Sequence, residues 1–172
     1  MALRNILIEG DETLRKKSRS VENFNKRLAD LLDDLKETAA DVGGAGLAAP
    51  QVGILRRAVI IMHEGEYLEL VNPEIKKRSK EEVGQFEGCL SCPDKRGYLM
   101  RPQKVTVRAQ DRNGEWFETE CEETAARAAC HEVDHLDGVL FTDLVDKVLT
   151  EDEVEELLER LAEEQDGEDM PE

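Results

Sequence analysis

The pattern of apolar and polar residues predicts a helix near the start of the chain. Between residues 21 and 44, apolar residues recur at steps of three and four, which is the spacing of one face of an α-helix. We expect Gly43 and Gly44 to end this helix. The predicted buried face consists of Phe24, Leu28, Leu31, Leu32, Leu35, Ala39 and Val42.

The middle of the chain shows short apolar runs and two-residue alternation of apolar and polar residues, which are typical of β-strands. Residues 56–63 and 67–73 are apolar runs that predict two strands, with a connection at 63–66. Residues 77–88 indicate extended chain with a glycine break. Residues 104–121 alternate apolar and polar positions on both sides of Asn113-Gly114, which is typical of a β-hairpin.

Two more helices are predicted in the last third of the chain. The first runs from about residue 122 to 136 and the second from 150 to 164, where Thr150 and Glu153 form a capping box. The apolar stripe of the second is Val154, Leu157, Leu158 and Leu161. Strands in the middle and helices at both ends indicate an α+β fold, with antiparallel strands packed around the helix at 122–136. We expect one domain over 1–165 and a flexible acidic tail over 166–172.

Composition narrows the class of protein. The 172 residues are 40% apolar and 37% charged, which suits one globular domain. The sequence has no run of 18 apolar residues and no apolar segment typical of a secretory signal, so we expect a cytoplasmic protein without a membrane anchor. The net charge of −17 repels phosphate backbones and argues against a nucleic-acid partner.

The segment "HEVDH" contains a candidate metal site. On a helix, His131 and His135 lie on one face with Cβ atoms about 5–6 Å apart, so one ion can bind a ring nitrogen of each. Glu132 lies off that face, where it can reach a water molecule rather than the ion. These are two of only three histidines and small alanines flank them, which favours a site over a chance pair.

Two histidines leave such a site incomplete, because a catalytic ion usually takes three protein ligands. One protease class adds a third histidine six residues after the second, but Phe141 stands at that position here. Another class uses a downstream glutamate. Glu155 has a suitable spacing, but the segment is so rich in glutamate that a match is nearly guaranteed, and its helix is typical of a surface helix. A cysteine is the third option.

The four cysteines suggest metal ligation or free thiols rather than disulfides in a cytosolic chain. Cys89 and Cys92 do not fit a zinc finger, since 38 residues separate Cys92 from His131 where such fingers have about 12. A redox pair normally opens a helix, whereas Pro93 and Gly97 indicate a turn. We therefore interpret Cys92 as a small buried residue.

Three segments in order resemble peptide deformylase: "GAGLAAPQ" (44–51), "EGCLS" (87–91) and "HEVDH" (131–135). The similarity extends from "DETLRKKS" (11–18) to "GVLFTDLV" (138–145). It implies that Cys89 is the third ligand, beside His131 and His135. It also implies ferrous iron as the working ion, with Zn²⁺, Ni²⁺ or Co²⁺ substituting in purified protein. The implied activity removes the N-formyl group from the initiator methionine of new polypeptides and releases formate.

The resemblance also implies roles for individual residues. Glu132 is the general base and acid, while Gln51 and the backbone N–H of Leu90 stabilise the oxyanion. The implied substrate-binding residues are Gly44, Ala45, Gly46, Gly88, Arg96, Arg127 and Ala128. Glycine backbone can accept an extended peptide as an added strand. Arg127 stands near the methionine pocket where many members have an apolar residue. We expect its guanidinium to point outward to solvent while its aliphatic stem lines the cleft.

Other interpretations make different predictions. A zinc peptidase cutting internal peptide bonds would not need Cys89, and a non-catalytic metal module would not need Glu132. Formylmethionyl nascent chains are the implied partners, with transient association with the ribosome. The acidic helix at 150–164 would be repelled by rRNA, which argues against docking through that helix.

Overall fold

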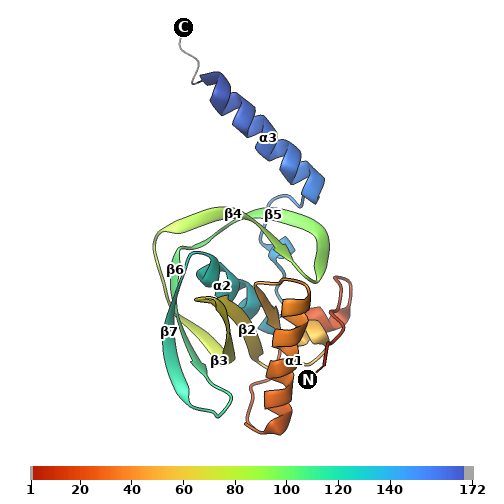
Figure 1. Cartoon of the computed structure of the whole chain (residues 1–172), viewed down its shortest axis with the longest axis vertical. Coiled ribbons are helices and arrows are strands. Elements are labelled where there is room, and N and C mark those ends of the chain that lie inside the picture. Colours follow the sequence, from red (N-terminus) through yellow and green to blue (C-terminus); the bar gives the residue numbers. More distant parts are fainter. Residues whose placement is uncertain (1, 169–172) are drawn as a thin grey trace.

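The computed structural model describes residues 2–168 and confirms the α+β class. A five-stranded antiparallel sheet has the strand order β1-β2-β3-β6-β7, and β4 and β5 form a separate hairpin (Figure 1). The strands are β1 (Gly46–Ala48), β2 (Ala58–His63), β3 (Glu66–Arg78), β4 (Glu82–Cys89), β5 (Cys92–Pro102), β6 (Lys104–Gln110) and β7 (Trp116–Glu122). The α-helices are α1 (Lys26–Asp41), α2 (Thr124–Leu136) and α3 (Glu151–Glu168), and the 3₁₀ turns are η1 (Glu12–Arg15), η2 (Ala49–Val52) and η3 (Phe141–Asp143).

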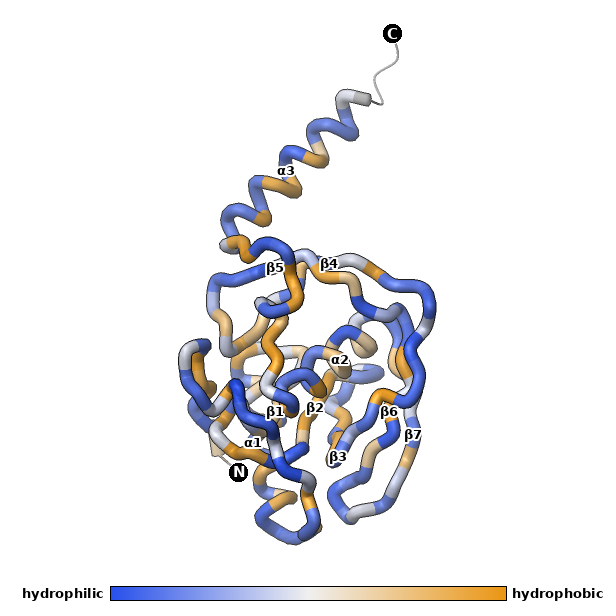
Figure 2. Tube along the Cα trace, turned by 180° about the vertical axis from the view of Figure 1, so that it is seen from behind, coloured by the Kyte–Doolittle hydropathy of each residue, from blue (hydrophilic) through white to orange (hydrophobic). Residues whose placement is uncertain are grey.

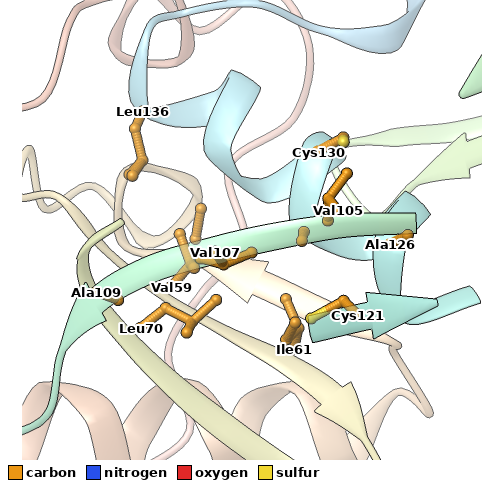
Figure 3. Packing of buried hydrophobic residues seen from close by; sticks show 12 residues of the cluster. Val59, Ile61, Leu70, Val105, Val107, Ala109, Cys121, Ala126, Cys130 and Leu136 are labelled. Carbon is orange, nitrogen blue, oxygen red and sulfur yellow. The ribbon is translucent and has the colours of Figure 1, made fainter. Parts of the chain in front are cut away.

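Helices α1 and α2 cover opposite faces of the sheet, because successive side chains of a strand point to opposite sides. Ala58 and Ile60 of β2 pack in the cluster that contains the apolar face of α1. Val59 and Ile61 pack in the cluster that contains α2 (Figure 3). Burial of each large aliphatic side chain contributes about 1.5–3 kcal/mol. The buried strand β2 thus anchors both helices to one sheet.

Helix α1 begins later than the periodicity predicts. The side chain of Asn25 accepts a hydrogen bond from Leu28 N at 3.2 Å and caps the helix. Val21 is not helical, since its backbone N–H donates to Asn72 Oδ1 at 2.8 Å. At the other end Val42 is 50% exposed, so it does not extend the buried face. Apolar spacing locates the helix, but the cap determines its first residue.

The predicted hairpins are present, with one correction. β6 and β7 pair across the turn at Asn113-Gly114, and β2 and β3 pair across Glu64-Gly65. The expected turn between Pro93 and Gly97 is wrong, because both lie in β5 and the chain reverses at residues 90–91. An added Cβ on Gly97 would lie 2.5 Å from a Val145 methyl carbon. This glycine allows close packing rather than a turn.

Helix α3 extends away from the rest of the molecule (Figures 1 and 2). The predicted capping box is present: Glu153 N donates to Thr150 Oγ1 at 3.2 Å. The apolar stripe is not buried, with Leu158 51% and Leu161 46% exposed. Residues 166–168, expected in the tail, are helical, and the remaining tail residues 169–172 lie outside the described residues. Within residues 2–168, no helix has the length and apolar character needed to cross a bilayer.

Gly138 ends α2 in the left-handed region, with φ at +75°. An added Cβ would lie 2.4 Å from the carbonyl oxygen of Arg15. We expect Gly138→Ala to lower the free energy of unfolding by about 2–4 kcal/mol, through backbone strain and this clash. Gly65→Ala is the matched control: φ is +83° and nothing lies near its added Cβ, so we expect a loss of about 1 kcal/mol. Urea denaturation at equal metal occupancy measures both, and equal losses would contradict the clash.

Candidate active site

Helix α2 and the end of β4 bring three potential ligands together. His131 and His135 lie one turn apart on α2, and their Nε2 atoms are 3.2 Å from each other. Cys89, the last residue of β4, places its Sγ 3.3 Å from His135 Nε2. The potential ligand atoms of the three residues all lie within 4.8 Å of one another. Hairpin β4–β5 thus carries a cysteine to a helix that follows it by more than thirty residues.

These three residues fit one transition-metal ion. In a tetrahedral site with bonds of about 2.0–2.3 Å, neighbouring ligand atoms are roughly 3.3–3.6 Å apart, and the measured separations of 3.2 Å and 3.3 Å are close to that range. Both imidazoles are buried. One sulfur and two imidazole nitrogens suit zinc, iron, nickel or cobalt.

A buried carboxylate orients the first histidine. Glu87 Oε2 lies 2.7 Å from His131 Nδ1, which fixes the tautomer and leaves Nε2 free for an ion. Arg101 donates to both oxygens of Glu87 at 3.1 Å and 2.8 Å, and to Asp134 at 2.9 Å. Burial alone would raise the pKa of Glu87, but His131 and Arg101 lower it to about 2. Glu87 is therefore ionised at neutral pH, and it supports His131 on α2.

The sequence analysis missed Glu87, Arg101 and Asp134. Glu87 stands two residues before Cys89, inside a segment already assigned to the site. A ligating histidine usually donates its second ring N–H to a carboxylate or carbonyl. A buried glutamate beside a proposed ligand was therefore a usable signal. Arg101 and Asp134 gave no local signal, because only the tertiary structure brings them together.

Glu132 lies in the same pocket with an unpaired oxygen. Its side chain is buried, its Oε1 is 3.9 Å from His131 Nε2, and its Oε2 has no hydrogen-bond partner within residues 2–168. Burial raises the pKa of Glu132 to about 7. Gly46 leaves room for this side chain, since an added Cβ would lie 3.0 Å from Glu132 Cγ. A carboxyl group with a near-neutral pKa can both accept and release a proton.

Gln51 is fixed beside the three ligands by hydrogen bonds at both ends of its amide. Its Oε1 accepts from Ala48 N at 3.0 Å. Its Nε2 lies 3.1 Å from Ser91 Oγ and 3.6 Å from Cys89 Sγ. The side chain is 1% exposed, so its donor atom has a fixed direction next to Cys89. Leu90 follows Cys89 in the two-residue turn between β4 and β5.

The glycine-rich segment ends in the outermost strand of the sheet. The carbonyl of Gly44 accepts from Tyr67 Oη at 2.6 Å, and that of Ala45 from Met62 N at 2.7 Å. Gly46 begins β1, which is the first strand in the sheet order, so among the described strands β2 is its one partner and its other edge is unpaired. An unpaired edge can accept an extended peptide.

Arg96 and Arg127, the two charged residues among the predicted substrate-binding positions, have side chains that contact other residues of the protein. Arg96 lies over Gly88, where an added Cβ would meet Arg96 Nη1 at 2.6 Å, and its guanidinium contacts Glu151. Arg127 does not point outward: Nη1 donates to Glu87 at 3.0 Å and Nη2 to the carbonyl of Val83 at 2.6 Å. The outward prediction is wrong because the buried Glu87 carboxylate attracts this cation. The neighbouring Ala128 is partly buried against the α2 cluster.

The sequence is similar to known enzymes over most of its length. A family model described as polypeptide deformylase matches residues 3–151. A peptide deformylase from Caldicellulosiruptor bescii is 54% identical over 156 residues, which cover 91% of this chain and 93% of that protein. One from Acetivibrio thermocellus is 48% identical over 155 residues, covering 90% and 91%.

The fold agrees with solved structures of such enzymes. A peptide deformylase from Thermotoga maritima matches with a TM-score of 0.82 at 36% identity, over 86% of this chain and all of that one. A class I type b peptide deformylase from Acinetobacter baumannii, with Met-Ala-Ser bound, matches at 0.81 and 33% identity, over 84% of this chain and 99% of that one. The protein is thus a hydrolase that removes the N-formyl group from nascent peptides, and the chain belongs to the polypeptide deformylase family.

Proposed function

We propose that Cys89, His131 and His135 hold one divalent metal ion, at which the formyl group of an N-formylmethionyl peptide is hydrolysed to formate. The observation that carries this proposal is the convergence of one sulfur and two imidazole nitrogens beside the unpaired carboxyl of Glu132. A bound ion supplies Lewis acidity, which polarises a carbonyl and makes water more acidic.

Glu132 performs the proton transfers in this proposal. Its carboxylate takes a proton from the attacking water and then delivers it to the departing amine of methionine. The pKa of about 7, raised by burial, suits both steps near neutral pH. Gln51 Nε2 and the backbone N–H of Leu90 donate to the formyl oxygen as it becomes negative. The two hydrogen bonds that hold the Gln51 amide support this role, since they fix its donor.

The peptide is proposed to bind as an extra strand along Gly44, Ala45 and Gly46. The edge position of β1 supports this arrangement. The Acinetobacter baumannii relative has Met-Ala-Ser bound, which supports the binding of a peptide to this kind of enzyme. Main-chain pairing does not depend on side chains, which suits an enzyme acting on many nascent chains. Gly88 and Arg96 would border the peptide from β4 and β5.

Arg127 and Ala128 are proposed to border the pocket for the methionine side chain. Arg127 would contribute only its aliphatic stem there, because Glu87 and Val83 hold its guanidinium. An uncharged lining of this kind suits the thioether of methionine.

Ferrous iron is the proposed working ion. The donor set supports a borderline transition metal, and the choice of iron over zinc, nickel or cobalt rests on the family resemblance. We also propose a cytoplasmic enzyme of one domain over 1–165. Helix α3 carries ten acidic residues and one arginine, so we expect no docking of this helix on rRNA.

Cys89→Ala tests the ligand set. We expect this variant to lose metal by elemental analysis and to lose formate release from a formyl-Met peptide. The loss of affinity should exceed the roughly 10–100-fold that is typical for residues supporting a ligand. Cys121→Ala is the control, because Cys121 is a free thiol buried in the α2 cluster. A Cys89→Ala protein that keeps its metal content and its formate release would refute the ligand role of Cys89.

Glu132→Gln separates catalysis from metal binding. We expect the variant to bind metal as the wild type does, because Glu132 is not a ligand in this proposal. Formate release should fall by about 10²–10⁴-fold, the usual contribution of a general acid–base group. Single-turnover assays with elemental analysis measure both quantities. Unchanged turnover would support a non-catalytic role for this carboxyl.

Glu87→Gln tests the support of His131. The variant keeps the shape of the side chain but loses the charge that faces His131, Arg101 and Arg127. We expect metal affinity to fall by about 10–100-fold, with thermal stability followed in parallel. Glu74→Gln is the control, since that side chain is 53% exposed. An unchanged metal Kd would show that the tautomer of His131 is fixed by something else.

A further inference from the structure

Cys89 has a second cysteine directly across the β4–β5 hairpin. Cys89 and Cys92 are register partners that flank the two-residue turn. Opposite residues of an antiparallel pair have Cα atoms about 4.5–5.5 Å apart and side chains on one face. Disulfides require Cα separations of about 4.4–6.8 Å. The hairpin therefore places the two sulfur atoms within reach of a bond.

The two cysteines differ in access to solvent. Cys92 is fully buried among Leu140 and Phe141, and the partly exposed Cys89 packs against the same cluster. The other two cysteines, Cys121 and Cys130, belong to the separate α2 cluster. A small oxidant can therefore reach Cys89 first, and Cys92 is the nearby thiol that can then react with the oxidised Cys89.

We propose that Cys89 and Cys92 form a reversible disulfide when a small-molecule disulfide oxidises the metal-free enzyme, and that this bond prevents metal binding. The proposal rests on the proposed role of Cys89 as a ligand. A cysteine binds a metal ion as a thiolate, and a sulfur atom in a disulfide does not carry that negative charge. A bound ion in turn occupies the Cys89 sulfur, so metal and disulfide exclude each other.

The reaction balances in two exchange steps. The Cys89 thiolate attacks the small disulfide, which forms a mixed disulfide and releases one small thiol. The Cys92 thiolate then attacks the Cys89 sulfur, which forms the internal disulfide and releases the second small thiol. Two protein thiols each lose a hydrogen, and two electrons pass to the oxidant. A dithiol reverses the reaction by attack on the more accessible sulfur.

Full-length protein, both loaded with zinc and stripped by a chelator, is incubated with oxidised glutathione. In the stripped protein we expect two of the four thiols to be lost, an intact mass lower by two hydrogens, and a peptide with a bond between Cys89 and Cys92. Zinc uptake should be lost and then restored by dithiothreitol. The zinc-loaded protein should keep all four thiols.

Cys92→Val and Cys92→Ala are the matched variants, so that one can replace the other if it folds poorly. Both should still bind zinc, but glutathione should now remain attached to Cys89, because the second step lacks its thiol. A wild-type protein that holds glutathione on Cys89, or that loses no thiols, would overturn the proposal. If the untreated stripped protein failed to take up zinc, the ligand role of Cys89 would be refuted instead. The two failures can be distinguished, because thiol count and mass report the disulfide without depending on zinc binding.

Discussion

The candidate active site depends on Arg101, which binds two carboxylates from different elements. It pairs with Glu87 at 2.8 Å on β4 and with Asp134 at 2.9 Å on α2. The Arg101 side chain is 8% exposed and that of Glu87 is 5% exposed. Breaking such a buried pair typically costs 3–5 kcal/mol, because the remaining charge has no partner. These contacts hold the hairpin against α2, and so determine how closely Cys89 approaches the two histidines.

The same network separates two glutamates for which different tasks are proposed. Glu87 is surrounded by cations, which lower its pKa to about 2. Glu132 has no cation against its Oε2 within the described residues, and burial raises its pKa to about 7. When two carboxyl groups of an enzyme have well-separated pKa values, one can keep a fixed charge while the other transfers protons. Arg101 and Arg127 thus serve the proposed chemistry through their ion pairs with Glu87.

Local patterns in the sequence predicted the elements and part of the site. The four-residue spacing of His131 and His135 lies within one helix, so periodicity was sufficient to place both on one face. Cys89 could be assigned only through the family resemblance, because its approach to α2 depends on how a distant hairpin packs. The prediction for Arg127 applied a general rule for long cations. It failed because the rule takes no account of a buried carboxylate that the sequence analysis had not identified.

Helix α3 shows why an amphipathic pattern does not establish packing. Its acidic first turn and capping box favour the helix, but acidic pairs four residues apart, such as Glu155 and Glu159, each cost about 0.2–0.5 kcal/mol. Its start is joined to β5 by the backbone pair of Arg96 and Leu149 and by the contact of Arg96 with Glu151. Since Arg96 also covers Gly88, one arginine connects α3 to the strand that ends in Cys89. The three proposed ligands are positioned by α2 and the hairpin, so the geometry of the candidate site does not require the apolar stripe of α3 to be covered.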